Sequence, residues 1–319
     1  MERLFIGMDI GGTNLRSALV DGSGDIVDRR RTASRIEEGR DAFCERMLFE
    51  ISKLMDAAAL RGKTVSAVGL GVPGLIGRDG LIHSSVNMRP LEGFNPAVFI
   101  ERQTGLPTVC ANDANVIALG EQRFGAGRGF SSCMVITSGT GRGSGLILAD
   151  RLWSGSGGFA AEFGHVTVDP EGYPCSCGNR GCLEQYVSAG ALVRMAREYL
   201  PPDVLADVGD RLDAELVAGL ARNGEPAAAA AFDQLGYWLG TALASLNNTL
   251  NLEAVVIGGG VASSFDLLLP ALELQVRRCC FAQIANGLSI LKAELGDDAG
   301  LLGGAALAAE WNGEGTAIC

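Results

Sequence analysis

Residues 8–24, MDIGGTNLRSALVDGSG, contain the pattern that decides the fold. The apolar run Leu4–Met8 before the glycines and the run Leu15–Val20 after them are typical of β-strands, and IGGTN between them is typical of a turn. DGSGD is a second turn signal, and a third strand begins at Ile26. The chain is therefore expected to open with a meander of three strands.

The hydrophobic period changes after this meander. From Asp41 onward, apolar residues recur at helical spacing and form one face: Phe43, Met47, Leu48, Ile51, Leu54, Met55 and Ala58. The segments Val65–Val72 and Thr108–Ala111 are expected to be buried strands, and ANVIALGEQRF after Asn112-Asp113 is expected to be a helix. This alternation of strands and helices indicates an α/β fold.

Residues 133–153, CMVITSGTGRGSGLILADRLW, repeat the opening order of strand, glycine-rich turn and strand. Both copies place a threonine among glycines between apolar segments, which indicates an internal duplication. Two related α/β domains that face each other across a cleft are therefore expected. The rest of the chain is expected to form helices over 189–200, 212–221 and 226–250, and strands over 254–257 and 288–291.

The composition indicates a folded acidic protein of 319 residues with a net charge of −11. A negatively charged surface repels a phosphate backbone, so no nucleic-acid partner is expected. The cluster Arg29-Arg30-Arg31 is expected to end a solvated strand. The amino-terminal apolar run is too short for a signal peptide, and the uncharged run Gln234–Leu252 has the spacing of a core helix rather than a membrane span. These features predict a cytoplasmic protein without a membrane partner and with reduced thiols.

Three glycine-rich turns follow predicted strands. Asp9-Ile10-Gly11-Gly12-Thr13 offers backbone N–H groups, a hydroxyl and a carboxylate, a set suited to phosphate and Mg²⁺, although an ordinary glycine-rich hairpin is an equal alternative. Gly139-Thr140-Gly141 repeats this chemistry, and Gly258-Gly259-Gly260 lies between a strand and a helix. None of them matches a Walker A loop or a G-x-G-x-x-G motif. Together they predict one nucleotide that is bound from two sides.

Asn112-Asp113 lies where a buried strand ends and a helix begins. The simplest interpretation is a helix N-cap, for which Asp is well suited. The functional alternative is a carboxylate that accepts the proton of a hydroxyl group while its oxygen attacks a phosphoryl group. The predicted cleft favours this second role.

Four metal-binding residue types lie close together in the sequence: His165, Cys175, Cys177 and Cys182. Three thiolates and one imidazole form a closed tetrahedral zinc site of the structural kind, and the alternative is a reducible disulfide or a reactive thiol pair. His83 is expected to be an ordinary polar residue. The other six cysteines, which are expected to be small buried hydrophobic residues, are Cys44, Cys110, Cys133, Cys279, Cys280 and Cys319.

Together these motifs resemble the ROK family of the actin-like ATPase and sugar kinase superfamily. DIGGTN, GVPG, NDAN, GTG, EFGH, CSCGNRGCLEQ and VIGGG occur in the family's order and span nearly the whole chain, which looks most like the family's bacterial glucokinases. The resemblance implies a two-domain, ribonuclease H-like α/β fold with an active-site cleft. We expect a smaller domain over residues 1–113, with a helix over 300–319 packed on it, and a larger domain over 114–299.

The resemblance also implies roles for individual residues. Asp113 would be the general base. The sugar would contact Asn87, Asn112, Asp113, Glu162, His165 and Glu184. Mg²⁺ and ATP would face Asp9, Gly11, Gly12, Thr13, Asn14, Gly139, Thr140, Gly141, Gly259 and Gly260. Structural Zn²⁺ would be bound by His165, Cys175, Cys177 and Cys182, with one imidazole nitrogen on the metal and the other directed to the sugar.

The implied activity is ATP-dependent phosphorylation of a hexose, with glucose expected to give glucose 6-phosphate, by a homodimer. N-acetylmannosamine, N-acetylglucosamine, fructose, mannose and allose are alternative substrates, and a sugar-responsive regulator or an actin-like filament protein are alternative classes. Two residues depart from the family's LGTGIGGG turn: Arg142, which would either add a cation near the phosphates or point to solvent, and Ser144, which puts a side chain where glycine allows close approach. Both are expected to affect nucleotide affinity. The family's repressors carry an amino-terminal helix-turn-helix extension, whereas this chain begins a few residues before its first strand.

Overall fold

The computed structural model describes residues 3–138 and 142–311, and the chain divides into two compact units. Unit 1 consists of Met1–Val135, Ser144–Ala161 and Ala293–Cys319, and unit 2 consists of Ile136–Gly143 and Glu162–Lys292. Neither unit is one continuous segment of the chain, because the chain passes from one to the other repeatedly.

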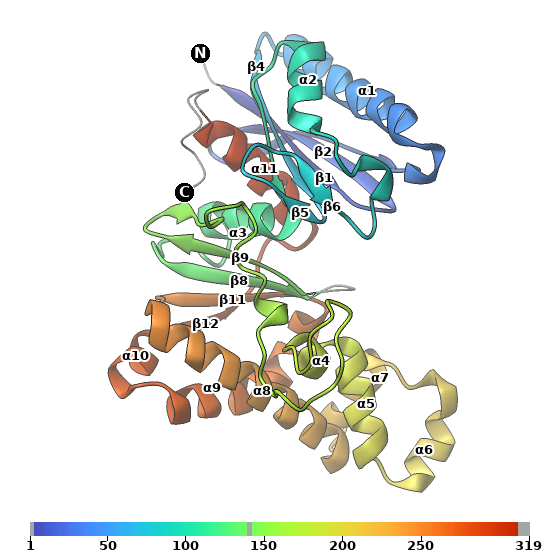
Figure 1. Cartoon of the computed structure of the whole chain (residues 1–319), viewed down its shortest axis with the longest axis vertical. Helices are drawn as coiled ribbons and strands as arrows, with labels where there is room; N and C mark the ends of the chain where they lie inside the picture. Colours follow the sequence, from blue (N-terminus) through green and yellow to red (C-terminus); the bar gives the residue numbers. More distant parts are fainter. Residues whose placement is uncertain (1–2, 139–141, 312–319) are drawn as a thin grey trace. The chain divides into compact units, whose positions relative to one another are not determined.

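The first five-stranded sheet has the strand order β3-β2-β1-β4-β7 (Figure 1). Its strands are β1 (Leu4–Ile10), β2 (Asn14–Asp21), β3 (Ile26–Ala33), β4 (Val65–Val72) and β7 (Thr108–Asn112). The first three are antiparallel neighbours, and β4 and β7 continue the sheet in parallel beyond β1. The predicted meander is confirmed, and its register pairs Asp9 with Arg16.

Both faces of β1 are buried. Leu4, Ile6 and Met8 pack in one hydrophobic cluster with residues of α1 (Arg40–Ala59), and Phe5 packs on the opposite face with residues of α11 (Ala299–Glu310) (Figure 1). A central strand that is covered on both faces explains the continuous apolar run at the start of the chain.

Glycines bring α11 directly against the sheet. A Cβ atom added at Gly7 would lie 1.8 Å from the carbonyl oxygen of Leu301, and one added at Gly69 would lie 1.9 Å from that of Gly304. At Gly303 an added Cβ would lie 1.8 Å from the carbonyl oxygen of Val116, in α3 (Asp113–Phe124). Side chains at these positions would force the backbones apart, so the glycines are a packing requirement of unit 1.

The second five-stranded sheet has the order β10-β9-β8-β11-β12. Its strands are β8 (Cys133–Ser138), β9 (Arg142–Leu148), β10 (Arg151–Leu152), β11 (Ala254–Gly259) and β12 (Ser289–Lys292). β9 and β10 are antiparallel, as β2 and β3 are, and β11 and β12 are parallel, as β4 and β7 are. In both sheets the first three strands along the chain form one side in reverse order, and the next two follow beyond the first strand. This shared topology supports the predicted duplication.

Helices make up most of the rest of unit 2. They are α4 (Glu184–Val187), α5 (Ala189–Tyr199), α6 (Pro202–Val208), α7 (Ala214–Arg222), α8 (Pro226–Leu250), α9 (Phe265–Cys279) and α10 (Ala282–Gly287). The predicted core helix is confirmed as α8, which approaches α9 closely where Cβ atoms at Gly236 and Gly240 would lie 2.8 Å from backbone oxygens. Within the described residues, no helix combines the length and the apolar character that crossing a membrane requires.

The boundaries of the units differ from the expected boundary at residue 113. Unit 1 extends to Val135 because α3 packs against α11 through Gly120 and Gly303, which keeps both helices with the first sheet. A further short hairpin, β5 (Leu75–Ile76) with β6 (Ile82–Ser84), and the helix α2 (Pro96–Thr104) also belong to unit 1. On this hairpin the exposed His83 packs edge-on against Phe159, with ring centroids 5.1 Å apart.

The expectation that six cysteines are buried is wrong for two of them. Cys44, Cys110 and Cys133 are buried, but Cys279 is exposed and Cys280 is partly exposed. These two residues lie where α9 ends, and the carboxyl-terminal turn of a surface helix faces solvent. Cys319 lies outside the described residues.

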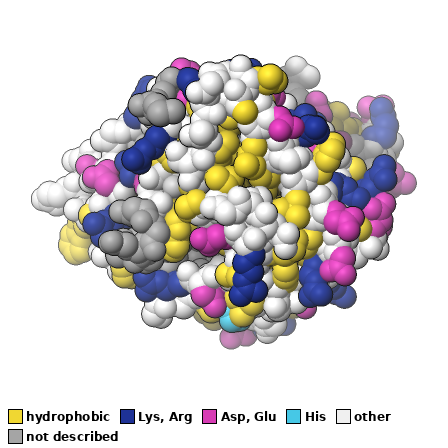
Figure 2. All heavy atoms as spheres, turned by 90° about the horizontal axis from the view of Figure 1, so that it is seen from above, with side chains coloured by type: hydrophobic (Ala, Val, Ile, Leu, Met, Phe, Trp, Pro, Cys, Tyr) yellow, Lys and Arg dark blue, Asp and Glu magenta, His cyan; other side chains and the backbone are white. Residues whose placement is uncertain are grey.

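Charges of both signs are mixed on the face of the molecule shown in Figure 2. The basic cluster lies within β3, not at the end of the strand as expected, and each of its side chains has a partner. Arg29 pairs with Asp298, Arg30 with the buried Glu50, and Arg31 donates to the side chain of Asn14. This cluster therefore contributes to the packing of unit 1.

Candidate active site

Asn112 and Asp113 lie at the junction of β7 and α3, and the N-cap is Asn112 rather than Asp113. The Asn112 Oδ1 atom accepts hydrogen bonds from the backbone N–H groups of Ala114 at 2.9 Å and Asn115 at 3.2 Å. Asp113 is the first helical residue, and its Oδ1 accepts from Ala114 at 2.9 Å. Capping by Asn112 means that the helix does not require the Asp113 carboxylate as its cap.

The other end of the Asn112 amide is also engaged. Its Nδ2 atom donates to the carbonyl oxygen of Gly74 at 3.0 Å, and Gly74 has a φ angle of 129° that a side chain would strain. The Pro73-Gly74 turn therefore orients Asn112, and the second hydrogen of Nδ2 is the part of the amide that remains for a ligand.

Asp9 lies near the end of β1, and about a quarter of its side chain is exposed (26%). Burial raises the pKa of Asp9 to about 6, the guanidinium of Arg16 opposes this shift, and the charges of Asp113 and Asp297 add to it. The electrostatic effect of Asp113 shows that the two carboxylates are near one another within unit 1. Such a pair of partly buried carboxylates favours a bound cation.

The glycine-rich turn after Asp9 is held by backbone hydrogen bonds. The N–H of Gly11 donates to the carbonyl oxygen of Asn14 at 2.8 Å, and the hydroxyl of Ser34 donates to that of Gly12 at 2.6 Å. Thr13 is exposed, and the exposed Asn87 lies beside the turn, where its Cβ would be 3.5 Å from one added at Gly12. The structure thus brings the first of the predicted phosphate turns and Asn87 together in unit 1.

Of the two other predicted nucleotide turns, only the one at Gly259 and Gly260 lies within the described residues. Gly139, Thr140 and Gly141 lie outside the described residues. Gly259 ends β11 with a φ angle of 75°, and Gly260 begins the turn that leads to α9. Both glycines are exposed, so their backbones are accessible in unit 2.

A second group of polar residues lies in unit 2. Glu162 precedes a short turn of 3₁₀-helix, Phe163–His165, and Glu184 begins α4. Desolvation raises the pKa of Glu162, the charge of His165 opposes this, and that of Glu184 adds to it, so the three side chains are neighbours. Two carboxylates and an imidazole form a set of donors and acceptors suited to hydroxyl groups.

His165, Cys175, Cys177 and Cys182 form one cluster, in which all four ligand atoms lie within 4.8 Å of one another. Nδ1 of His165 is 3.6 Å from the sulfur of Cys175, and the sulfurs of Cys177 and Cys182 are also 3.6 Å apart. A tetrahedral zinc site with bonds of about 2.3 Å has ligand atoms about 3.8 Å apart. The donor set and its spacing therefore fit zinc, with Nδ1 as the imidazole ligand.

The polypeptide around this cluster is fixed by its own contacts. Gly181 has a φ angle of 68°, and a Cβ atom there would lie 1.6 Å from the carbonyl oxygen of Asp169. The hydroxyl of Tyr186 donates to Asp169 at 3.0 Å and accepts from the N–H of Tyr173 at 3.2 Å. These contacts connect the cysteine loop to α4, the helix that Glu184 begins.

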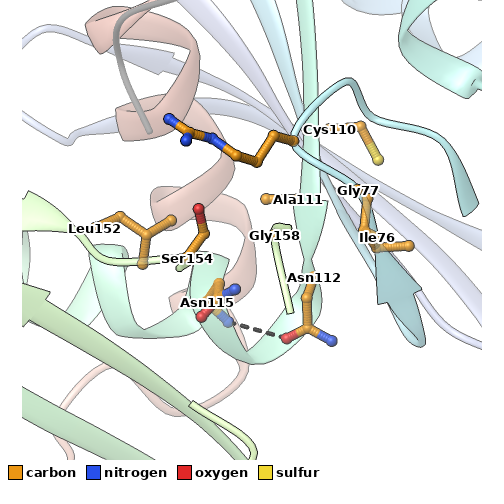
Figure 3. Close-up of a pocket in the computed structure, with 10 residues that line it drawn as sticks. Ile76, Gly77, Cys110, Ala111, Asn112, Asn115, Leu152, Ser154 and Gly158 are labelled. Atoms are coloured by element: carbon orange, nitrogen blue, oxygen red, sulfur yellow. Dashed lines mark hydrogen bonds between the residues drawn. The ribbon is translucent and has the colours of Figure 1, made fainter. Parts of the chain in front are cut away.

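A small cavity in unit 1 is lined in part by Asn112 (Figure 3). The centre of a water molecule can occupy about 10 Å³ of it, which is near the minimum for one ordered water. Within the described residues, two buried atoms that line it, Oδ1 of Asn115 and Oγ of Ser154, have no hydrogen-bond partner. This cavity is the size of a structural water site, and a water there would lie next to Asn112.

The duplicated sheets and the paired carboxylates beside a glycine-rich turn define a protein with the two-domain actin-like fold of the sugar kinases. The chain belongs to the ROK family, which it matches over residues 5–311. Both the family and the fold class that the sequence predicted are confirmed.

Several relatives are similar over nearly their whole length. A glucokinase from Halalkalibacterium halodurans is 35% identical, with 95% of this chain and 94% of the relative covered. A ROK family glucokinase from Streptomyces griseus, solved in complex with glucose and AMPPNP, is 35% identical with a TM-score of 0.75, over 97% of this chain and 100% of that chain. The Bacillus subtilis xylose repressor is 28% identical, over 93% of this chain but 75% of the repressor.

Two residues that the structure connects to the site were not assigned a role there from the sequence: Gly300 lies against Asp9, and Asn115 lines the cavity beside Asn112. A third residue, Ser144, was expected to act on the nucleotide, but the structure also shows its hydroxyl donating to the carbonyl oxygen of Ala161, immediately before Glu162. Asn115 falls within the NDAN motif, but only its position in the fold indicates what it touches.

Proposed function

We propose that the protein catalyses ATP-dependent phosphorylation of a hexose, with glucose as the substrate and glucose 6-phosphate as the product. The observation that carries this proposal is the arrangement at the start of α3, where Asn112 caps the helix and leaves Asp113 at its first position, near Asp9. The glucokinases among the relatives support the same reaction.

Asp113 acts as the general base in this proposal. Its carboxylate takes the proton of the sugar 6-hydroxyl as that oxygen bonds to the γ-phosphorus of ATP and the bond from phosphorus to the β-phosphate oxygen breaks, releasing ADP. A hydroxyl group is a weak nucleophile at neutral pH, and a positioned carboxylate supplies about 10²–10⁴-fold in rate.

In this proposal the sugar is bound by polar side chains that suit hydroxyl groups. Glu162 and Glu184 accept hydrogen bonds from its hydroxyl groups, and the remaining N–H of Asn112 donates to it, together with Asn87. His165 contributes Nε2, because its Nδ1 faces the cysteines. A carboxylate that a bound sugar covers without giving it a hydroxyl partner would cost about 1–3 kcal/mol, so such groups discriminate among sugars.

Mg²⁺ and ATP are proposed to contact Asp9 and the turn Gly11–Asn14. The further proposed nucleotide contacts are Gly139, Thr140, Gly141, Gly259 and Gly260. Asp9 would hold Mg²⁺, directly or through water, and a bound cation would favour the charged carboxylate, whose pKa burial raises. Mg²⁺ would neutralise charge on the transferred phosphoryl group. The side chain of Asn14 faces Arg31, so its contribution is to the shape of the turn.

Zinc bound by His165, Cys175, Cys177 and Cys182 would have a structural role. Four protein ligands leave no open coordination position, so the ion would hold the loop between Glu162 and Glu184 in one conformation. A dithiol or disulfide role is less suited to this cluster, because the imidazole lies among the sulfurs.

The active form is proposed to be a homodimer in the cytoplasm, where ATP is available and thiolates stay reduced. A sugar-responsive regulator is the second candidate, favoured by the similarity to the xylose repressor and to a ROK transcriptional regulator of TM-score 0.84.

An assay that couples ADP release to a spectroscopic signal tests these alternatives. The sugars are glucose, N-acetylmannosamine, N-acetylglucosamine, fructose, mannose and allose. The highest kcat/KM is expected for glucose. A higher value for another sugar would reassign the substrate, and sugar binding without any ADP release would support the regulator.

A further inference from the structure

Ser144 makes a hydrogen bond to a residue outside the predicted phosphate turn. It lies on β9, only 6% exposed, and its hydroxyl donates a hydrogen bond to the carbonyl oxygen of Ala161. Both residues belong to unit 1, and Glu162 is the first residue of the segment of unit 2 that follows. This hydrogen bond is therefore made to the peptide group that joins Ala161 to Glu162.

Ala161 has an unusual backbone conformation. Its φ angle is 69°, in the left-handed region that residues with a Cβ atom rarely adopt. The neighbouring backbone is closed by two hydrogen bonds, from the N–H of Ala160 to Ser154 and from the N–H of His165 to the carbonyl oxygen of Glu162, both 3.0 Å. Because the peptide group is planar, a hydrogen bond to the Ala161 oxygen also fixes the direction in which the chain enters Glu162.

The strand that carries Ser144 is itself firmly placed. A Cβ atom added at the next residue, Gly145, would lie 2.4 Å from the Cβ of Ala118 and 2.9 Å from the carbonyl oxygen of Ala114, both in α3. β9 therefore lies directly against the helix that Asp113 begins, within unit 1. A hydroxyl on this strand is a rigid donor rather than a mobile surface group.

We propose that Ser144 is a positioning residue for Glu162 and so a determinant of sugar affinity. The hydroxyl keeps the peptide group between Ala161 and Glu162 in its strained orientation, and this orientation directs the Glu162 carboxylate. The inference rests on the proposed function, in which Glu162 binds the sugar. The expected effect of Ser144 on the nucleotide stays a separate prediction, which the same experiment tests.

Calorimetry on the full-length protein tests this role. Glucose and AMPPNP are titrated separately into the wild type, Ser144→Ala and Ser144→Cys, whose somewhat larger thiol is only a weak donor. Both variants are expected to raise the Kd for glucose about tenfold and to change the Kd for AMPPNP less than about twofold. The matched control is Ser52→Ala, which removes another hydroxyl-to-carbonyl hydrogen bond, to Phe49 on α1, and should leave both Kd values unchanged.

A second substitution tests the conformational part of the argument. Glycine adopts a φ angle near 69° without strain, so Ala161→Gly in the Ser144→Ala background should recover part of the lost glucose affinity. A double variant that binds glucose no better than Ser144→Ala would overturn the role given to the peptide group.

The remaining outcomes are also decisive. Wild-type glucose affinity in both Ser144 variants, or equal losses for glucose and AMPPNP with a lower Tm, would overturn the positioning role. A weaker nucleotide complex with unchanged glucose binding would support the phosphate-turn role instead. If the wild type binds glucose but phosphorylates none of the sugars, the proposed catalysis fails while the role of Ser144 is still measured by the glucose titration.

Discussion

Gly300 and Asp9 are in direct contact: a Cβ atom added at Gly300 would lie 2.9 Å from Cγ of Asp9 and 3.0 Å from its Cβ. Gly300 lies in the first turn of α11, and Asp9 lies on β1 just before the glycine-rich turn. The glycine therefore leaves the space that the Asp9 side chain occupies. The carboxylate also faces the amino-terminal end of a helix, where a negative charge is favoured.

Gly300→Ala is expected to displace Asp9 and weaken binding of Mg²⁺-ATP about tenfold, because the new methyl group and the carboxylate cannot occupy the same space. The crowding should also cost about 1–3 kcal/mol of unfolding free energy. Calorimetry and urea unfolding measure the two effects. The matched control is Gly219→Ala in α7, where an added Cβ meets nothing within 4 Å and should stabilise by about 0.5–1 kcal/mol. Unchanged nucleotide binding in Gly300→Ala would show that this contact does not position Asp9.

Asp9→Asn is expected to remove activity and yet stabilise the metal-free protein at pH 7. The folded state keeps the Asp9 proton up to about pH 6, whereas the unfolded state releases it near pH 3.8, so wild-type stability falls as the pH rises through this window. Asparagine does not titrate, so the free energy of unfolding of the Asp9→Asn variant at pH 7 should exceed that of the wild type by about 1–3 kcal/mol.

Urea unfolding of both proteins without Mg²⁺ measures this difference, which should disappear below about pH 4. Added Mg²⁺-ATP should then stabilise the wild type but not Asp9→Asn. A variant that is less stable than the wild type at pH 7 would contradict the view that Asp9 is held for a cation.

Asp113→Asn and Asp113→Ala are both expected to lower kcat by about 10²–10⁴-fold, since neither side chain accepts the hydroxyl proton. Glucose affinity by calorimetry should stay close to that of the wild type. Helix α3 should persist in both variants, because Asn112 provides its cap. Near-normal turnover in either variant would remove Asp113 from the role of base.

Cys177→Ser is expected to lose bound zinc and most of the soluble folded protein, because one missing thiolate opens the four-ligand site. Elemental analysis and the yield of soluble protein measure the two effects. Cys279→Ser, at an exposed cysteine outside the cluster, is the control and should resemble the wild type. Full activity of metal-free Cys177→Ser would rule out a structural zinc.

Much of the fold could be predicted because its signals are local. The three-strand meander, the helix α8 and the strand at 65–72 each depend on the spacing of apolar residues within one segment, and all three are confirmed. The ROK motifs could be recognised for the same reason, since each is a short run of residues with a fixed order. Exposure was less predictable, as Cys279 and Cys280 show, because it depends on where a helix ends at the surface.

The sequence by itself determined the family, the alternation of strands and helices, and the four residues of the His–Cys cluster, since these depend on residue type and spacing along the chain. Only the tertiary structure decided that Asn112, not Asp113, caps α3, that Gly300 meets Asp9, and that Ser144 bonds to Ala161. The last two contacts join residues far apart in the chain, and packing sets their distances. The choice of cap depends on φ and ψ at one junction, which the surrounding fold imposes.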